Sequence, residues 1–129
     1  MSVILVVDDN PQMAGLIQDI VEMAGYEAEV AYSGLDGLDK AREGMPDLIL
    51  VDLMMPEMDG WEVYHQLREF SSIPVIFVTA YDTPENQARA KELGADGLLS
   101  KDMVTAQLVQ HIQFILEGTL TPQRKEYLH

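Results

Sequence analysis

Five short runs rich in apolar residues alternate with longer segments of mixed polarity along the chain. The runs are Val3–Val7, Glu27–Tyr32, Leu48–Val51, Val75–Val78 and Gly97–Ser100. The first, third and fourth are unbroken, which is the pattern of strands buried on both faces of a parallel sheet. The second alternates polar and apolar residues, as an edge strand does. The sequence therefore predicts five strands, one of them at an edge of the sheet.

A segment with helical features follows each predicted strand. Asn, Ser and Thr favour helix N-caps, proline suits the first helical turn, and glycine often ends a helix. On these signals, helices are predicted from Asn10-Pro11 to Gly25, from Ser33 to about Gly44, from about Trp61 to Phe70, from Thr83-Pro84-Glu85 to Gly94, and from about Val104 to Leu116.

Apolar stripes at helical spacing mark the faces that these helices are expected to bury. The first helix has such a stripe, formed by Met13, Leu16, Ile17, Ile20, Val21 and Met23. The second helix carries Leu35, Leu38 and Ala41, and the fourth carries Ala88, Ala90 and Leu93. Trp61, Tyr64 and Phe70 in the third are interpreted as packing residues. Five strand-then-helix units imply one α/β domain, with a five-stranded parallel sheet, right-handed crossovers and helices on both faces.

Polar side chains end four of the five predicted strands, at the sheet edge where ligands bind in such folds. Asp8-Asp9 follows the first strand, Asp52 the third, Thr79 the fourth and Lys101 the fifth. Any one of these residues alone is more typical of a cap or turn. Three converging carboxylates, however, repel one another unless their pKa values rise or a cation neutralises them. A hard cation such as Mg²⁺ is the simpler answer, with Lys101 and Thr79 left to bind phosphoryl oxygens.

Composition narrows the classes of function. The 129 residues suit one domain, and 8 Lys plus Arg against 22 Asp plus Glu give a formal net charge of −14. This charge disfavours direct binding to nucleic acid or to an anionic membrane. The absence of cysteine excludes disulfides and thiolate metal sites, and no apolar run approaches the roughly 18 residues of a membrane span. The N-terminus has no secretory signal pattern, so a cytoplasmic location is expected.

Four motifs carry a resemblance to a known family. They read VVDDN, LILVDLMMPEMDG, PVIFVTA and GADGLLSK, in this order. Together they resemble the receiver domain of two-component response regulators, from about Val3 to Leu116. The resemblance implies the flavodoxin-like strand order 2-1-3-4-5. We expect residues 1–118 to form the receiver domain and residues 119–129 to be a C-terminal tail or the start of a linker.

The resemblance also implies a metal site. Asp9 and Asp52 match the direct carboxylate ligands of Mg²⁺, and Asp8 is expected to act through a metal-bound water. The backbone carbonyl of Met54 matches the third protein ligand. In the turn that follows, Asp59-Gly60 matches a position where glycine permits a backbone shape that other residues resist.

A phosphorylation site is implied in the same way. Asp52 matches the phosphoacceptor, Thr79 the switch hydroxyl, and Lys101 the lysine that pairs with the phosphoryl group. Two departures from the family pattern concern switching. Asp102 stands where most receivers have proline after a cis peptide, so this bond is predicted to be trans and the loop reshaped. Leu98 replaces the usual switch aromatic, which leaves Tyr81 as the nearest aromatic able to take part or to cover the phosphoryl group.

Three functions follow from these observations. The first is a phosphorylation switch that is not a turnover enzyme. A sensor histidine kinase or phosphotransfer protein donates a phosphoryl group to Asp52. The phosphorylated state then acts through a downstream effector protein or effector domain, or through a homodimer formed on activation. The second is a degenerate receiver that serves as a constitutive protein-interaction module. The third, a phosphatase of the haloacid-dehalogenase type, is disfavoured because it needs a second Asp two residues after the nucleophile in strand one, and this chain has Asp8-Asp9-Asn10.

Overall fold

The computed structural model describes residues 1–118, and the predicted tail or linker at 119–129 lies outside them. Its five strands are β1 (Val3–Val7), β2 (Glu27–Ala31), β3 (Leu48–Val51), β4 (Val75–Thr79) and β5 (Gly97–Ser100). They form one parallel sheet in the order β2-β1-β3-β4-β5. The predicted flavodoxin-like α/β fold is therefore confirmed.

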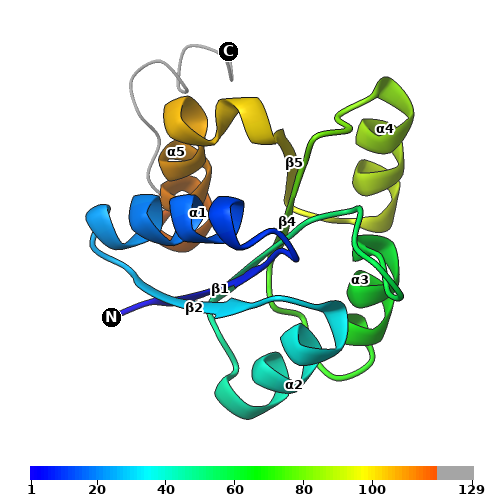
Figure 1. The fold of residues 1–129 in the computed structure, drawn as a ribbon, viewed down its shortest axis with the longest axis horizontal. Coiled ribbons are helices and arrows are strands. Elements are labelled where there is room, and N and C mark those ends of the chain that lie inside the picture. Colours follow the sequence, from blue (N-terminus) through cyan, green and yellow to red (C-terminus); the bar gives the residue numbers. More distant parts are fainter. Residues whose placement is uncertain (119–129) are drawn as a thin grey trace.

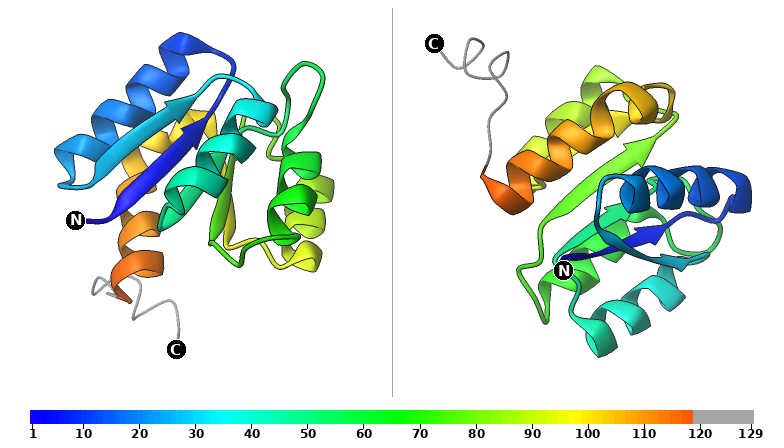
Figure 2. Two further views of the ribbon diagram at one scale, coloured as in Figure 1. Left: turned by 90° about the horizontal axis from the view of Figure 1, so that it is seen from below. Right: turned by 90° about the vertical axis from the view of Figure 1, so that its left-hand side faces the viewer.

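The helices cover both faces of this sheet. They are α1 (Pro11–Met23), α2 (Gly34–Gly44), α3 (Gly60–Arg68), α4 (Pro84–Leu93) and α5 (Val104–Glu117), the last preceded by a 3₁₀ turn over Lys101–Met103. Figures 1 and 2 show α1 and α5 on one face and α2, α3 and α4 on the other. None of the helices in this part of the chain has both the length and the hydropathy of a membrane-spanning segment.

Strand β1 shows how the sheet divides the core in two. Successive side chains of a strand point to opposite faces. Ile4 and Val6 join the cluster that includes side chains of α1 and α5, whereas Leu5 and Val7 join the cluster beneath α2, α3 and α4. All four are almost completely buried. Because both faces are covered, an unbroken apolar run is the pattern that this central strand requires.

Some predicted stripe members do not face the core. In α1 the buried residues are Ala14, Ile17 and Val21, which follow a spacing of three and four, while Met23 is 89% exposed. Leu16 in α1, Leu35 in α2 and Ala88 in α4 are also exposed. The predicted stripe was therefore too wide in α1, because the helix buries a narrower arc than its apolar residues span.

The element boundaries differ slightly from those predicted. Strand β4 extends to Thr79, which pairs in register with Ser100 of β5. Helix α3 begins one residue earlier than expected, because the Asp59 side chain caps it by accepting a hydrogen bond from the Glu62 backbone N–H at 2.9 Å. Strand β2 ends at Ala31 rather than Tyr32, and α3 ends at Arg68 rather than Phe70. None of these shifts moves a strand-end residue away from the carboxyl edge.

Candidate functional site

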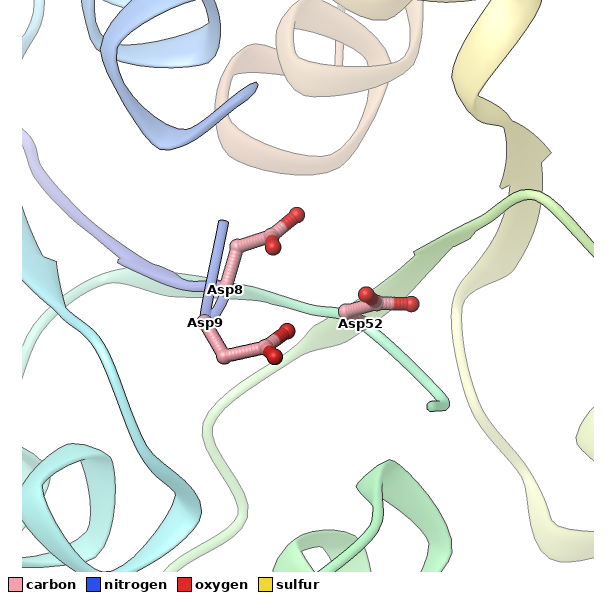
Figure 3. Close-up of side chains that lie close together, drawn as sticks. All are labelled: Asp8, Asp9 and Asp52. Carbon is pink, nitrogen blue, oxygen red and sulfur yellow. The ribbon is translucent and has the colours of Figure 1, made fainter. Parts of the chain in front are cut away.

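Three carboxylates meet at the carboxyl edge of the sheet. Strands β1 and β3 are neighbours in register, with Val7 opposite Val51, so the residues that follow them come side by side. Asp8, Asp9 and Asp52 each offer a carboxylate oxygen within 4.8 Å of the other two. Figure 3 shows the side chains of Asp8 and Asp9 extending toward the side on which Asp52 lies. The convergence predicted from the strand ends is therefore present.

The local backbone fixes two of these carboxylates. Asp8 Oδ1 accepts a hydrogen bond from the Asn10 backbone N–H at 2.9 Å, and Asn10 in turn caps α1. Asp52 Oδ1 accepts one from the Met54 backbone N–H at 3.3 Å. Asp8 and Asp52 are 2% and 5% exposed, whereas Asp9 is exposed. The second oxygen of each buried carboxylate faces the Lys101 ammonium group.

Lys101 brings one positive charge to this cluster. Its Nζ lies 2.9 Å from Asp52 Oδ2, to which it donates a hydrogen bond, and 3.0 Å from Asp8 Oδ2. Burial raises the pKa of Asp52, and the hydrogen bond and charge of Lys101 offset this only in part. Burial by itself lowers the pKa of Lys101, but its contacts with the carboxylates of Asp52 and Asp8 outweigh that effect and raise it. The ammonium group therefore stays charged.

The lysine reaches the cluster with no proline after it. The Lys101–Asp102 peptide is trans, as predicted. The chain turns through the 3₁₀ segment instead, where Ser100 Oγ accepts a hydrogen bond from the Asp102 backbone N–H at 3.2 Å. This capped turn carries the chain from β5 into α5.

The charges at this edge fit a divalent cation. Three ionised carboxylates and one ammonium group sum to −3 + 1 = −2. Within residues 1–118, Asp8 Oδ2 is a buried side-chain oxygen that makes no hydrogen bond, so its only compensation is the ion pair with Lys101. A cluster of three carboxylates provides the hard oxygen donors that Mg²⁺ prefers.

Thr79 stands at the end of the neighbouring strand. It is fully buried, and its Oγ1 accepts a hydrogen bond from the Tyr81 backbone N–H at 3.0 Å. The Tyr81 carbonyl in turn accepts one from Asn86 Nδ2 at 2.8 Å, which ties the β4–α4 loop to the first turn of α4. The Tyr81 side chain itself is 54% exposed. The hydroxyl proton of Thr79 therefore remains available as a donor.

Comparisons with known proteins agree with this arrangement. Residues 4–113 match the family described as the response regulator receiver domain. The polar-differentiation response regulator DivK of Brucella ovis is 37% identical over 116 residues, which are 88% of this chain and 94% of that protein. The chain belongs to the response regulator receiver domain family. A solved structure of the Vibrio cholerae chemotaxis protein CheY4 matches this receiver domain with a TM-score of 0.83 at 31% identity, covering 90% of this chain and 99% of that one.

Longer proteins also contain a region similar to this receiver domain. The CpxR homolog of Haemophilus influenzae, a transcriptional regulatory protein, is 34% identical over 122 residues, which are 95% of this chain and 53% of that protein. The transcriptional regulatory protein PcoR of Escherichia coli is 37% identical over 114 residues, and half of its length is covered. The chain thus spans about half the length of these relatives. The family match gives no support to the haloacid-dehalogenase hypothesis.

The reason for glycine at position 60 was predicted wrongly. Gly60 does not adopt a positive φ, so the turn needs no unusual backbone shape there. It needs space instead: a Cβ at Gly60 would lie 2.4 Å from the Asp52 carbonyl oxygen and 2.8 Å from Leu53 Cα. The positive φ in this loop belongs to Glu57.

Sequence reasoning also missed contacts made by side chains of α4. The Arg89 guanidinium lies 4.3 Å from the ring centroid of Trp61 in α3, and Asn86 ties the loop as described. No spacing rule links an exposed arginine to a tryptophan 28 positions earlier, so the sequence held no signal for this pair. Leu98 is buried as the prediction of a packing residue requires, and the predicted packing residues Trp61 and Tyr64 are buried too.

Proposed function

We propose that this receiver domain is a phosphorylation-dependent switch in which Asp52 accepts the phosphoryl group. The observation that carries the proposal is the position of the Asp52 carboxylate, which lies buried beside two further carboxylates and 2.9 Å from the Lys101 ammonium group. A buried carboxylate surrounded by these charges serves no packing purpose and destabilises the fold when it is left uncompensated. Phosphoryl transfer needs such positioned charge, because the protein contributes mainly alignment and electrostatic stabilisation.

The donor in this proposal is a phosphohistidine of a sensor histidine kinase or phosphotransfer protein. An oxygen of Asp52 attacks the phosphorus atom, the phosphorus–nitrogen bond breaks, and the imidazole leaves with its electron pair and takes up a proton. The product is an acyl phosphate on Asp52. Hydrolysis by water later regenerates the carboxylate, so the domain catalyses its own modification and reset without turning over an external substrate.

Lys101 and Thr79 bind the transferred group. The Lys101 ammonium group already touches the Asp52 carboxylate, so a short movement brings it to a phosphoryl oxygen. The Thr79 hydroxyl donates to another phosphoryl oxygen, and its movement carries the β4–α4 loop, because the Tyr81 backbone N–H is bonded to it. Adding about −1.5 to −2 charges at Asp52 therefore pulls two separate elements toward the site.

The acidic cluster is the Mg²⁺ site of this proposal. Asp9 and Asp52 would hold the ion directly, the Met54 backbone carbonyl would be the third protein ligand, and Asp8 would act through a water. When bound, Mg²⁺ would supply positive charge that stabilises the phosphoryl oxygens during transfer. The residues present fit this role, because the 2+ charge of the ion would balance their summed charge of −2.

Partners follow from the same chemistry. The phosphodonor is a histidine kinase or phosphotransfer protein, and the output is a downstream effector protein, an effector domain or a homodimer formed on activation. DivK, which this chain matches over 94% of its length, is compatible with a separate effector protein. The CpxR homolog, of which 53% is covered, is compatible with an effector domain in the same protein. A cytoplasmic location suits a partner of such kinases.

The competing function is a degenerate receiver that binds partners without phosphorylation. Incubation with acetyl phosphate and Mg²⁺ distinguishes the two. We expect the wild-type protein to gain the mass of one phosphoryl group in a base-labile bond, and Asp52→Asn to gain none. Asp59→Asn is the matched control, because Asp59 caps α3 outside the acidic cluster and should leave labelling intact. An unlabelled wild type would favour the degenerate receiver, and equal labelling of Asp52→Asn would remove Asp52 from the role.

A further inference from the structure

Helix α4 buries few apolar side chains against the domain. Ala90 is the one buried residue of α4, whereas α3 buries five of its nine. Figures 1 and 2 show α4 beside α3 at one side of the molecule. Among the residues that the structure describes, α3 and α4 share a hydrogen bond, from Tyr64 Oη to the Leu93 carbonyl at 2.8 Å, and a stack in which the Arg89 guanidinium lies 4.3 Å from the ring centroid of Trp61. Few buried apolar contacts make α4 a segment of low local stability.

Trp61 lies next to the segments that carry the site residues Asp52 and Thr79. It follows Gly60, whose Cα packs against the backbone of Asp52 and Leu53 and whose N–H donates to the Leu53 carbonyl at 2.8 Å. Its ring centroid lies 4.9 Å from that of Phe77, two residues before Thr79 in β4. The tryptophan is 8% exposed, and its outer face carries Arg89. Trp61 therefore lies between the acceptor loop, strand β4 and helix α4.

We propose that the stack of Arg89 on Trp61 is the clamp that holds α4 against α3 in the unphosphorylated domain, and that phosphorylation of Asp52 opens it. This inference rests on the proposed function. Trp61 is tied to the Asp52 backbone through Gly60, while α4 is tied to Thr79 through the chain of hydrogen bonds from Thr79 Oγ1 to Tyr81 and from Tyr81 to Asn86. When Thr79 moves toward the phosphoryl group, Arg89 and Trp61 are displaced relative to each other.

The clamp also explains how a signal leaves a site with leucine at position 98. Leu98 lies opposite Phe77 in the β4–β5 register and has neither a hydroxyl nor a flat ring. Phe77 is the residue on which Trp61 packs. A displacement of β4 therefore reaches α4 through Phe77, Trp61 and Arg89 without a rotation at β5.

The chain provides matched controls for a test. Arg42 lies 4.6 Å from the ring centroid of Phe70, a similar stack on the same face of the sheet that does not involve α4. Arg42→Ala therefore removes an arginine stack without opening the clamp. Tyr64→Phe removes the other link between α3 and α4, its hydrogen bond to Leu93, but leaves the stack in place. Arg89→Lys keeps the positive charge and loses the planar group.

The experiment measures amide hydrogen exchange in α4 before and after treatment with acetyl phosphate and Mg²⁺, with the labelled fraction read by mass. Unlabelled Arg89→Ala should exchange its α4 amides about two- to fivefold faster than the wild type, the range expected for loss of one exposed cation–π contact. Arg42→Ala should leave the exchange rate of the α4 amides unchanged, and Arg89→Lys should give a rate between those of the wild type and Arg89→Ala. Phosphorylation should accelerate α4 exchange in the wild type and in Tyr64→Phe, but much less in Arg89→Ala. Acrylamide should also quench the fluorescence of Trp61, the single tryptophan, more strongly in the phosphorylated wild type.

The outcomes separate this inference from the proposed function. Wild-type protein that is labelled on Asp52 but keeps its α4 exchange rates and its Trp61 quenching would overturn the clamp and leave the switch intact. Equal α4 exchange in unlabelled Arg89→Ala and Arg42→Ala would overturn it as well. Failure of the wild type to take any label would overturn the proposed function and, with it, the inference.

Discussion

Lys101 Nζ forms an ion pair with Asp52 Oδ2 at 2.9 Å, although the residue after the lysine is Asp102 rather than proline. The same ammonium group lies 3.0 Å from Asp8 Oδ2, so it bridges carboxylates from two different strands. One positive charge does not balance three negative ones. The carboxylates therefore repel one another, and a divalent cation bound among them would relieve this repulsion. The expected result is a higher melting temperature.

Mg²⁺ should raise the melting temperature of the wild-type protein in the millimolar range, because an ion that binds only the folded state stabilises it by mass action. Asp9→Ala should lose most of this response, since Asp9 supplies the exposed carboxylate of the cluster. Glu43→Gln removes one exposed acidic charge from α2, away from the cluster, and should keep the response. Differential scanning calorimetry across a Mg²⁺ titration makes the comparison. A wild-type melting temperature that does not change with the Mg²⁺ concentration would indicate a degenerate metal site.

Gly60→Ala should destabilise the domain by about 1–3 kcal/mol, because the new Cβ meets backbone atoms that cannot rotate away. Gly15→Ala in α1 is the matched control, since nothing lies within 4 Å of a Cβ at that position. There alanine should stabilise by roughly 0.5–1 kcal/mol through helix propensity. Urea unfolding measures both free energies. If the two variants moved in the same direction, the close approach of Gly60 to Asp52 would not be the reason for glycine.

Tyr26 makes the stability of the folded domain depend on pH at high pH. Burial, followed by the hydrogen bond and negative charge of Glu117, raises the pKa of Tyr26 to about 12 from the ordinary 10.0. Because the folded protein holds this proton more tightly, the stabilisation is complete below pH 10.0 and is lost as the pH rises to about 12.

Tyr26→Phe should therefore be less stable than the wild type at neutral pH, by about 1 kcal/mol for the lost hydrogen bond. The difference should shrink between pH 10.0 and about 12. Tyr32→Phe is the control for loss of a hydroxyl at an exposed tyrosine, and it should change the free energy of unfolding at neutral pH much less. Urea midpoints measured at several pH values give the answer, and a difference that widened with pH would contradict the assignment.

On the hypothesis that the Tyr81 ring covers the phosphoryl group, Tyr81→Ala should speed its loss from Asp52, because hydrolysis needs an in-line water that such a ring would obstruct. Leu98→Ala should act on stability instead, by about 2–3 kcal/mol, as the truncation of a buried leucine does. Decay of the labelled mass after removal of acetyl phosphate measures the first effect, and urea unfolding measures the second. A lifetime unchanged in Tyr81→Ala and strongly altered in Leu98→Ala would reverse these roles.

The sequence by itself determined the strands, the order of strands and helices along the chain, and the polar residues at the strand ends. These features depend on local patterns: Val3–Val7 and Leu48–Val51 are apolar throughout because both faces of the sheet are covered, and Asp8 and Asp52 follow them directly. Parallel strands bring their carboxyl ends to one edge, so the carboxylate cluster follows from the pattern. The strand order came from the resemblance to receivers, and the structure confirmed it.

Only the tertiary structure decided how close these groups come and which exposed residues have partners. The reach of Lys101 to Asp8 and Asp52 depends on the capped 3₁₀ turn after β5, and the need for glycine at position 60 depends on a backbone that arrives from β3. The stack of Arg89 on Trp61 joins two helices whose sequences contain no sign of it. Such contacts depend on how elements distant in sequence pack, and hydrophobic periodicity fixes only which side of each element faces the core.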